Sequence, residues 1–438
     1  MNVLFYSYLI LIDSYFTRNF EQINSLFMAK HFSIPDFYKS PIIRTIKERS
    51  QILDPRKKDM TPSVLDFGSV RFLIPRHFGF CYGVQNAIDI AYKSIDEQEG
   101  KRIFLLSEMI HNPDVNADLQ QKGVQFLFET DGSERIPLSE INQNDVVIVP
   151  AFGTTVEMQK TLEAKGIDPY IYDTTCPFVE KVWKRGKQMG VKGFNIVIHG
   201  KYQHEETRAT FSHAAQNSKV VVVFNVEEAE FLAECMLGNK TIEEFEKKFG
   251  HKCTDGFNPQ TDLEFFGVIN QTTMLATETK EVMAVLRKAA TQRFGEVEVP
   301  NHMADTNDTL CYATNENQSA TLGLREEPAD LAIVVGGYNS SNTLHIVELL
   351  EQKMPTYHIK NASEFVDGNL VQHFSQWDKK LHKTEQWIPK PSSNPITISI
   401  TSGASCPDAL VDDVILKIVS LFENTKSIEE AMMPFQEK

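Results

Sequence analysis

Residues 71–91 read RFLIPRHFGFCYGVQNAIDIA, and this stretch contains one complete example of the unit on which the fold depends. The apolar run at 71–74 predicts a short strand. Beyond Cys81, apolar side chains recur at helical spacing, at Val84, Ala87, Ile88 and Ala91. The stretch therefore predicts a strand, then a glycine-containing turn that carries Cys81, then a helix.

Short apolar runs and helical patterns continue to alternate toward the C-terminus. The further strand candidates are 102–106, 145–149, 169–172, 194–198, 219–224, 265–269, 330–335 and 396–400. Helical patterns also follow Asn339 and Pro407. This alternation predicts repeated βα units and an α/β fold with mainly parallel sheets.

Two further cysteines lie in turns like that of Cys81. They are Cys176, in Asp173-Thr-Thr-Cys-Pro177, and Cys311, in Thr309-Leu-Cys-Tyr-Ala313. An iron–sulfur cluster is normally held by four thiolates, so three cysteines from separate turns indicate a cubane with one iron open to a substrate. Isolated cysteines are more often core residues, so spacing alone leaves a protein without a cluster as the alternative.

The remaining cysteines have different surroundings. Cys235 lies in a helical apolar stretch and is expected to be a buried structural thiol, whereas Cys253 lies in a polar segment and Cys406 precedes Pro407. No pair is spaced C-x-x-C, so the zinc-ribbon and thioredoxin signatures are absent. Six cysteines without a disulfide-like pattern favour a reducing compartment, and we expect the cytoplasm.

Length and charge narrow the class of protein. A chain of 438 residues is long enough for two or three domains, and a formal net charge of −15 disfavours a general nucleic-acid binder. The apolar run at 3–12 lacks the basic region and the cleavage site of a signal peptide, and it is too short to cross a bilayer. We therefore expect neither nucleic acid nor membrane as a partner. Met28 begins a more typical N-terminus, so the segment before it is interpreted as an upstream misassignment or an unstructured extension.

Three regions interrupt the α/β pattern. Residues 29–69 contain several turn breakers and are expected to form a peripheral extension, and residues 237–262 are expected to form an exposed insertion. Residues 379–395, with prolines at 389, 391 and 395, predict a surface loop before the last strand.

Polar residues collect where the predicted strands end, at the edge where open α/β sheets bind ligands. The chain has neither G-x-x-x-x-G-K-[ST] nor G-x-G-x-x-G, so the usual nucleotide cradles are missing. Asn339-Ser-Ser-Asn342 and Ser402-Gly-Ala-Ser405 each combine small polar side chains with the start of a helix, where backbone N–H groups are free. Helix capping is the alternative reading, but two such runs at equivalent strand ends favour a phosphate-like ligand.

Histidines lie at strand ends too. His111, His199 and His204 could donate to phosphate oxygens or transfer protons. In an extended loop residues two apart point to the same side, so His204 and Glu206 are expected to address one small ligand and to act as an acid–base pair. The alternatives are histidines that face solvent and a Glu206 that only orients its loop or pairs with Arg208.

Taken together, eight motifs resemble those of one family. From about residue 70 to its C-terminal helix, the chain resembles 4-hydroxy-3-methylbut-2-enyl diphosphate reductase, the LytB or IspH family. In family order the motifs are Gly79-Phe-Cys-Tyr-Gly-Val84, Ile110-His-Asn112, Asp173-Thr-Thr-Cys-Pro177, His204-Glu-Glu206, Gln271-Thr-Thr273, Cys311-Tyr-Ala-Thr314, Asn339-Ser-Ser-Asn342 and Gly403-Ala-Ser405.

The resemblance implies three similar α/β domains around a central [4Fe–4S] cluster. We divide the chain into an N-terminal extension (1–69), domain 1 (70–176), domain 2 with its insertion (177–298), and domain 3 with a C-terminal tail (299–438). The implied cluster ligands are Cys81, Cys176 and Cys311.

The resemblance also implies the reaction. The substrate's terminal hydroxyl would bind the open iron, Glu206 would relay the proton that releases it as water, and Thr272 would help to orient it. The implied diphosphate ligands are His111, His204, Ser340, Ser341, Asn342 and Ser405. Two electrons, from a donor such as ferredoxin or flavodoxin, and two protons would give isopentenyl and dimethylallyl diphosphates, in the last step of the non-mevalonate isoprenoid pathway.

The chain departs from the common family pattern at Phe152, where many members carry a histidine that reaches the diphosphate. A Phe variant is also known in the branch that includes photosynthetic lineages. Two rival functions stay open: a hydro-lyase that uses the same kind of cluster without net electron transfer, and an iron–sulfur sensor or RNA-associated protein. The acidic charge and the many strand-end polar residues favour the reductase.

Overall fold

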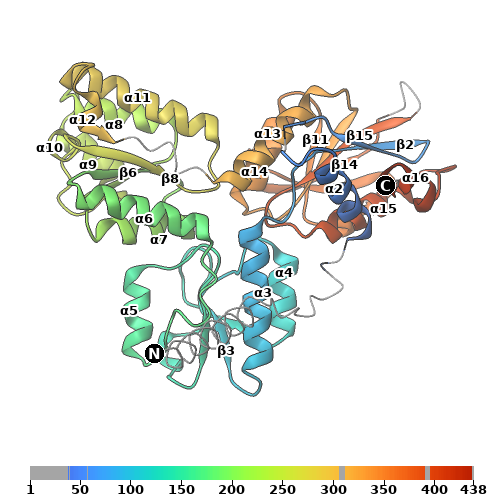
Figure 1. Ribbon diagram of the computed structural model, residues 1–438, viewed down its shortest axis with the longest axis horizontal. Coiled ribbons are helices and arrows are strands. Elements are labelled where there is room, and N and C mark those ends of the chain that lie inside the picture. The colour runs from blue at the N-terminus through green and yellow to red at the C-terminus, as the bar shows by residue number, and fades with distance from the viewer. Residues whose placement is uncertain (1–37, 39, 57, 305–310, 390–394, 437–438) are drawn as a thin grey trace, which may run out of the picture. The chain divides into compact units, whose positions relative to one another are not determined.

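The computed structural model describes residues 38, 40–56, 58–304, 311–389 and 395–436. In this part of the chain the strands form three sheets, each accompanied by helices (Figure 1). Every pairing in the two smaller sheets is parallel, as are the central pairings of the largest one. The prediction of an α/β fold with mainly parallel sheets is therefore confirmed.

The first sheet has the strand order β4-β3-β5. Its strands are β3 (Ile103–Leu105), β4 (Val124–Phe126) and β5 (Val146–Ile148). The helices of this region are α3 (Tyr82–Glu97), α4 (Pro113–Gln121), η2 (Leu138–Glu140) and α5 (Val156–Ala164).

The second sheet has the order β7-β6-β8-β9. Its strands are β6 (Asn195–His199), β7 (Val220–Val223), β8 (Phe266–Asn270) and β9 (Met303–Ala304). The helices are α6 (Pro177–Val191), α7 (Glu205–Ala215), α8 (Val226–Met236), α9 (Ile242–Phe249), η3 (Gly250–Lys252), α10 (Pro259–Asp262), α11 (Ala276–Phe294) and α12 (Val299–His302).

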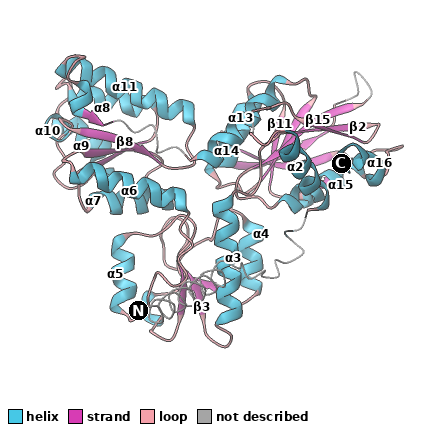
Figure 2. Ribbon diagram, in the orientation of Figure 1, coloured by secondary structure: helices cyan, strands magenta, loops and turns pink. Residues whose placement is uncertain are grey.

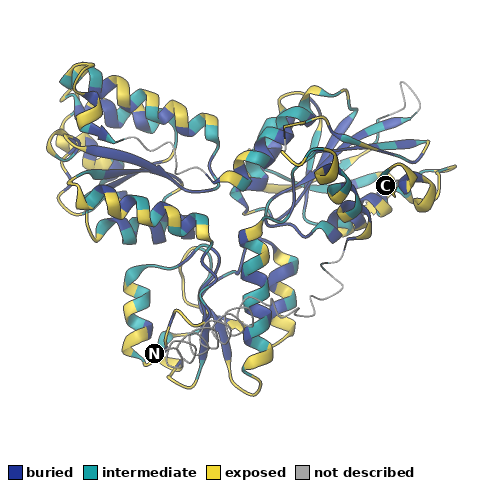
Figure 3. Cartoon of the chain, viewed as in Figure 1, coloured by how far each residue is buried: buried dark blue, intermediate teal, exposed yellow. Residues whose placement is uncertain are grey.

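Helices cover both faces of this second sheet, as Figure 2 shows. Successive strand residues point to opposite faces, so Val197 packs in one core with α8 and α11, while Ile198 packs in another with α6 and α7. Strands covered on both sides must be apolar throughout, which explains why their sequences are continuous apolar runs. Figure 3 shows the buried residues concentrated along these strands.

The third sheet has eight strands in the order β1-β2-β15-β10-β11-β13-β12, with β14 paired to β13. The strands are β1 (Ser63–Asp66), β2 (Val70–Ile74), β10 (Leu331–Val335), β11 (Thr356–Ile359), β12 (Phe365–Asp367), β13 (Leu370–Ser375), β14 (Lys380–Glu385) and β15 (Ile396–Ser402). The helices are α2 (Pro41–Leu53), α13 (Tyr312–Glu326), α14 (Ser341–Glu351), η4 (Ala362–Glu364), α15 (Asp408–Val419) and α16 (Ile428–Gln436).

Strands β1 and β2 of the N-terminal region belong to this third sheet, and helix α2 packs against it. Strand β2 pairs in parallel with β15, although the sequence division places it at the start of domain 1. Helix α2 buries Ile42, Ile43 and Ile46 in the core that β2 and α15 share, so the expectation of a peripheral extension is wrong for its described residues. The backbone N–H groups of Ile42 and Ile43 also donate to the Asp412 carboxylate at 3.0 Å each, which ties α2 to α15. The predicted division into domains otherwise stays a prediction.

The other irregular regions are more ordered than the sequence suggested. The insertion is not simply exposed, because Phe245, Phe249 and Phe257 are fully buried against α8 and β7. The predicted loop before the last strand contains β14, which forms a hairpin with β13. Residues 169–172, predicted as a strand, form a turn, while the other predicted strands agree to within about two residues.

The predictions for residues 1–28 lie outside the described residues. Among the helices that the structure describes, none combines the length and the apolar character that a membrane crossing requires.

Candidate active site

Each of the three turn cysteines occupies the same local position, the N-cap of a helix. Cys81 precedes α3, Cys176 precedes α6 and Cys311 precedes α13, each with an extended backbone. The first N–H groups of a helix have no partner within the helix and carry a partial positive charge. Three helix starts of this kind favour a negatively charged group between them.

The three cysteines meet in one cavity of about 80 Å³. The cavity is also lined by every other site residue that the family resemblance implies, namely His111, His204, Glu206, Thr272, Ser340, Ser341, Asn342 and Ser405. These residues come from elements of all three sheets. The tertiary structure therefore brings together the full set that the resemblance implies.

The thiols lie in surroundings that disfavour an unpaired thiolate. Burial raises the pKa of Cys176 to about 12, and burial also raises the pKa of Cys81 and of Cys311. Backbone N–H groups at the start of α3 and α6 act in the opposite direction on the pKa of Cys81 and Cys176, and the three sulfurs repel one another when charged. Metal ligation removes the thiol proton, so thiolates bound to a metal centre would be stable here where unpaired thiolates would not.

The three cysteines are arranged in a way that fits a polynuclear cluster. Among the described residues, no group of three or more His, Cys, Asp or Glu side chains is arranged to hold one metal ion. A cubane differs in that each of its irons takes its own thiolate, so its cysteines stand apart around a common centre. Three cysteines on three helix starts around one cavity meet that requirement.

Gly83 makes room for one of these sulfurs. A Cβ atom at Gly83 would lie 2.4 Å from Cys176 Sγ, so the two helix starts can approach only because residue 83 lacks a side chain. The family motif that contains Cys81 therefore also provides the space that Cys176 occupies.

If the three cysteines hold the cluster that the resemblance implies, Gly83→Ala should lose most of its iron. Alanine favours a helix over glycine by about 1 kcal/mol, so a loss cannot be ascribed to a weaker α3. Iron and sulfide content after anaerobic purification measures the effect. Gly186→Ala is the matched control, because residue 186 lies inside α6 and its new Cβ would find its nearest neighbour at an ordinary 3.5 Å. Wild-type iron content in Gly83→Ala would refute the steric argument.

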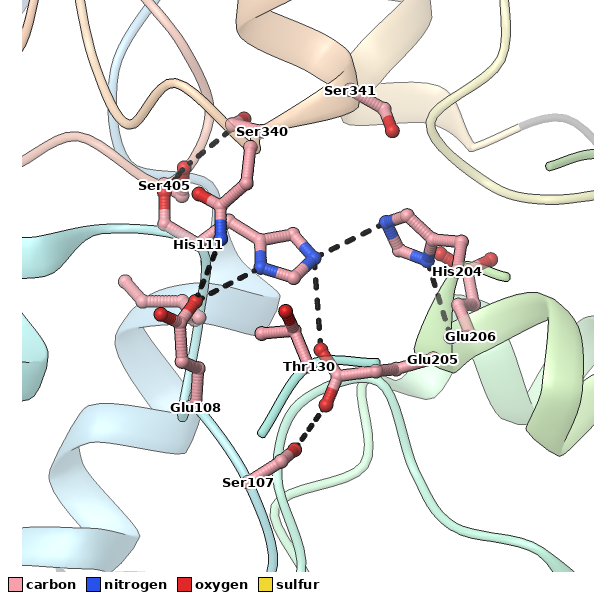
Figure 4. A network of polar contacts seen from close by, with 12 residues as sticks. Ser107, Glu108, His111, Thr130, His204, Glu205, Glu206, Ser340, Ser341 and Ser405 are labelled. Carbon is pink, nitrogen blue, oxygen red and sulfur yellow. Dashed lines mark hydrogen bonds and ion pairs between the residues drawn. The ribbon is translucent and has the colours of Figure 1, made fainter. Parts of the chain in front are cut away.

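His111 and His204 form a hydrogen-bonded pair (Figure 4). Both line the cavity in which the cysteines meet. The backbone N–H of Glu206 donates to His204 Nδ1 at 3.2 Å, and burial beside His111 holds the pKa of His204 well below its usual range. His204 is therefore neutral with its proton on Nε2, and it donates to His111 Nε2 at 3.2 Å. His111 then carries its own proton on Nδ1, which lies 3.1 Å from Glu108 Oε2.

Glu206 is held by Thr272 from the second sheet's last connection. The Thr272 backbone N–H donates to Glu206 Oε1 at 2.5 Å, and its hydroxyl donates to Oε2 at 2.9 Å. Burial raises the pKa of Glu206 to about 7, against the opposing effect of the Thr272 hydrogen bonds. A carboxyl group that is half protonated near neutral pH is well suited to proton transfer.

His204 and Glu206 line the same cavity, but the predicted reason for this, an extended loop, is wrong. The residues do not lie in an extended loop, because His204 is the N-cap of α7 and Glu206 belongs to its first turn. Arg208 does not pair with Glu206, since its guanidinium donates to the carbonyl oxygens of Gln203 and Thr130. His199 is turned away from the cavity, with Nδ1 2.9 Å from the Thr279 hydroxyl.

The serine and asparagine side chains form the third wall. Ser340 caps α14, and the Ser405 hydroxyl lies 3.4 Å from the Ser340 hydroxyl. Asn342 is buried, with a relative exposure of 2%. Neither its amide nitrogen nor its amide oxygen has a hydrogen-bond partner among the described residues. An unpaired buried amide is costly, so this side chain is prepared for a polar ligand.

Phe152 packs against both histidines. Its ring stacks on His111 with a centroid distance of 4.3 Å and meets His204 edge-on at 5.5 Å. An aryl ring offers no N–H donor, so Phe152 can orient the histidines but cannot hold an anion.

Sequence reasoning missed two carboxylates at this site. Glu108 contacts both His111 and the amide of Asn339 on the third sheet's connection, the latter at 3.0 Å. Glu205 is buried and contacts Ser107 and His111. In the sequence, Glu108 lies three residues before His111, and Glu205 lies between His204 and Glu206. These positions were the available signals.

Comparisons with known proteins agree with this site. The family model described as LytB protein matches residues 72–419. The 4-hydroxy-3-methylbut-2-enyl diphosphate reductase of a Synechococcus strain is 40% identical over 362 residues, 82% of this chain and 87% of that protein. The protein of the same name from Prochlorococcus marinus is 36% identical over 414 residues, 94% of this chain and 96% of that protein.

Two solved structures are also similar. One is (E)-4-hydroxy-3-methyl-but-2-enyl diphosphate reductase, with 26% identity, a TM-score of 0.47, and coverage of 78% of this chain and 97% of that one. The other is the E-1-hydroxy-2-methyl-but-2-enyl-4-diphosphate reductase from Plasmodium falciparum, with 20% identity, a TM-score of 0.55, and coverage of 77% and 85%. The similarity to the Plasmodium falciparum structure supports the fold. The family match over most of the sequence, together with relatives of this similarity, establishes that the chain belongs to the LytB family.

Proposed function

We propose that the chain is a 4-hydroxy-3-methylbut-2-enyl diphosphate reductase. It removes the hydroxyl group of this allylic diphosphate with two electrons and two protons, giving water and isopentenyl and dimethylallyl diphosphates, the last step of the non-mevalonate pathway. The observation that carries the proposal is the single cavity in which three cysteines, one carboxyl group and a set of neutral hydrogen-bond donors meet.

The proposed cofactor is one [4Fe–4S] cluster held by Cys81, Cys176 and Cys311. When bound, it supplies the electrons for the reduction and a Lewis-acidic iron for the substrate hydroxyl. The three cysteine-capped helix starts, and the space that Gly83 leaves for Cys176, support this assignment.

The diphosphate would be held by donors that face the cavity from all three sheets. His204 already carries its proton on Nε2, so it can donate to a phosphate oxygen once it releases His111. Ser340, Ser341 and Asn342 lie at the start of α14, where unpaired backbone N–H groups add further donors. Ser405 completes this wall from the turn after β15.

Glu206 is the proposed proton donor to the leaving hydroxyl. Loss of hydroxide from an allylic carbon is unfavourable unless a proton arrives, and the carboxyl group is the acid in the cavity with a pKa of about 7. Thr272 fixes both carboxyl oxygens, so that the acid keeps one orientation.

An external donor must supply the electrons, and we propose a small redox protein such as ferredoxin or flavodoxin. We also propose a reducing compartment, the cytoplasm, because all six cysteines are free thiols in the described part of the chain.

The test is anaerobic purification with iron and sulfide analysis, followed by turnover of the hydroxylated diphosphate with and without reductant. The reductase requires reductant and releases the two isomeric diphosphates. Turnover without reductant would identify a hydro-lyase, and a cluster that is not reoxidised by the substrate would indicate a sensor.

We expect Phe152→Leu to retain substantial turnover. The variant loses a stacked ring contact with His111, and such contacts are worth about 0.5–1.5 kcal/mol. That energy corresponds to a rise in KM of up to about tenfold with little change in kcat. Steady-state kinetics of the iron-replete variant measures both. A loss as large as that of a cysteine variant would mean that the ring has a further role.

A further inference from the structure

Glu205 lines one cavity, and its carboxylate contacts His111, which lines another. The cavity that His111 lines is the active-site cavity, which His204 lines too. The cavity that Glu205 lines is a separate one of about 180 Å³, which Ser107 lines too. We call this separate cavity the outer cavity. Gly132, which also lines it, is exposed, so solvent reaches the outer cavity.

Ser107, Glu205, His111 and His204 lie in a row of polar contacts, in which the step from Glu205 to His111 is longer than a hydrogen bond (Figure 4). The Ser107 hydroxyl donates to Glu205 Oε1. Glu205 Oε2 is buried without a hydrogen-bond partner among the described residues, and His111 Nε2 lies 3.8 Å from it. His111 in turn contacts His204 at the active site.

The reaction creates a demand for such a path. Each turnover consumes two protons, and the Glu206 carboxyl group can supply only one of them. Glu206 is fully buried and its carboxyl group contacts Thr272 rather than the outer cavity. A bound diphosphate would also block access from the active-site side.

We propose that Glu205 is the relay residue through which protons pass from the outer cavity to His111 and the bound diphosphate. This inference rests on the proposed function. When His204 turns its N–H to the diphosphate, His111 Nε2 becomes free to accept the proton of the Glu205 carboxyl group. His111 then passes that proton to a phosphate oxygen, and the Glu205 carboxylate regains one from water through the Ser107 hydroxyl.

The charges around Glu205 suit a group that exchanges protons. Burial raises its pKa, Glu108 acts in the same direction, and His111 and Arg208 act in the opposite direction. These opposing influences leave the carboxyl group able to release its proton when His111 becomes an acceptor.

The test compares two carboxylates that touch the same imidazole. Glu205→Gln cannot transfer a proton, so we expect kcat to fall about tenfold or more, KM to stay within about twofold, and the solvent deuterium isotope effect on kcat to increase. Glu108→Gln is the matched variant, because Glu108 contacts His111 Nδ1 but does not line the outer cavity. It should raise KM without a larger isotope effect. Glu205→Asp keeps an acid and should recover part of kcat.

The proposal is overturned if Glu205→Gln keeps the wild-type kcat, or if it only raises KM as Glu108→Gln does. Should Glu205→Gln fail to fold, Ser107→Ala replaces it, since it removes the hydroxyl between the outer cavity and Glu205, and an unchanged kcat there is equally contradictory. Wild-type turnover is measured first. Its absence would refute the proposed function, whereas normal wild-type turnover with an indifferent Glu205→Gln would refute the relay alone.

Discussion

Cys176→Ser is expected to lose the cluster and with it essentially all turnover. The cysteine caps α6 in the cavity where Cys81 and Cys311 also meet, and it alone among the three lies against Gly83. A serine hydroxyl is a poor substitute for a thiolate, because soft iron–sulfur irons select sulfur ligands. Iron and sulfide analysis and the visible absorbance of anaerobically purified protein measure the loss. Cys81→Ser and Cys311→Ser should behave in the same way.

Two cysteines provide controls for this result. Cys235 is buried in α8, away from the cavity, and Cys253 lies in the segment after η3. Cys235→Ser and Cys253→Ser should keep both iron and turnover, apart from any general loss of stability. An iron-replete and fully active Cys176→Ser protein would end the cluster proposal.

Glu206→Gln is expected to keep its cluster, to bind the hydroxylated diphosphate, and to lose turnover by about 10²–10⁴-fold. Glutamine preserves the shape and can still accept the Thr272 N–H, but it has no proton to release near neutral pH. Anaerobic kinetics with excess reductant measures kcat, and substrate binding to the oxidised protein is measured separately. Near-normal turnover would refute the role of Glu206 as the acid and leave the cluster proposal intact.

The pH dependence follows from the same carboxyl group. Because burial raises the pKa of Glu206 to about 7, its protonated form persists up to neutral pH and is lost above it. The wild-type kcat should therefore decline between about pH 7 and pH 9 if this proton transfer limits the rate. The residual activity of Glu206→Gln should lack that decline.

Much of the site could be predicted because the family motifs are short and local. Cys81, Cys176 and Cys311 could be recognised at the start of helical patterns, and in the structure each is the N-cap of its helix. Ser340 could be recognised in the same way. Local rules of capping and strand ends operate over a few residues, so a sequence window contains all the information that they need.

Contacts between distant residues could not be predicted in this way. Nothing near Glu205 in the sequence reveals that Ser107 and His111 lie against it, because those contacts depend on how two separate sheets meet. Glu108 was missed for the same reason.

The sequence alone determined the α/β class, most of the strands and the placement of Cys81, Cys176 and Cys311 in turns that precede helices, because hydrophobic periodicity and turn chemistry act locally. Only the tertiary structure decided which sheet each strand joins. Strand β2 precedes the helix that Cys81 caps, yet it pairs with β15, more than three hundred residues later in the chain. The same holds for the inserted phenylalanines, Phe245, Phe249 and Phe257, whose burial depends on an apolar surface that α8 and β7 supply. A strand or an aromatic side chain becomes buried against whichever apolar surface the folded chain presents, and that surface is assembled from distant segments.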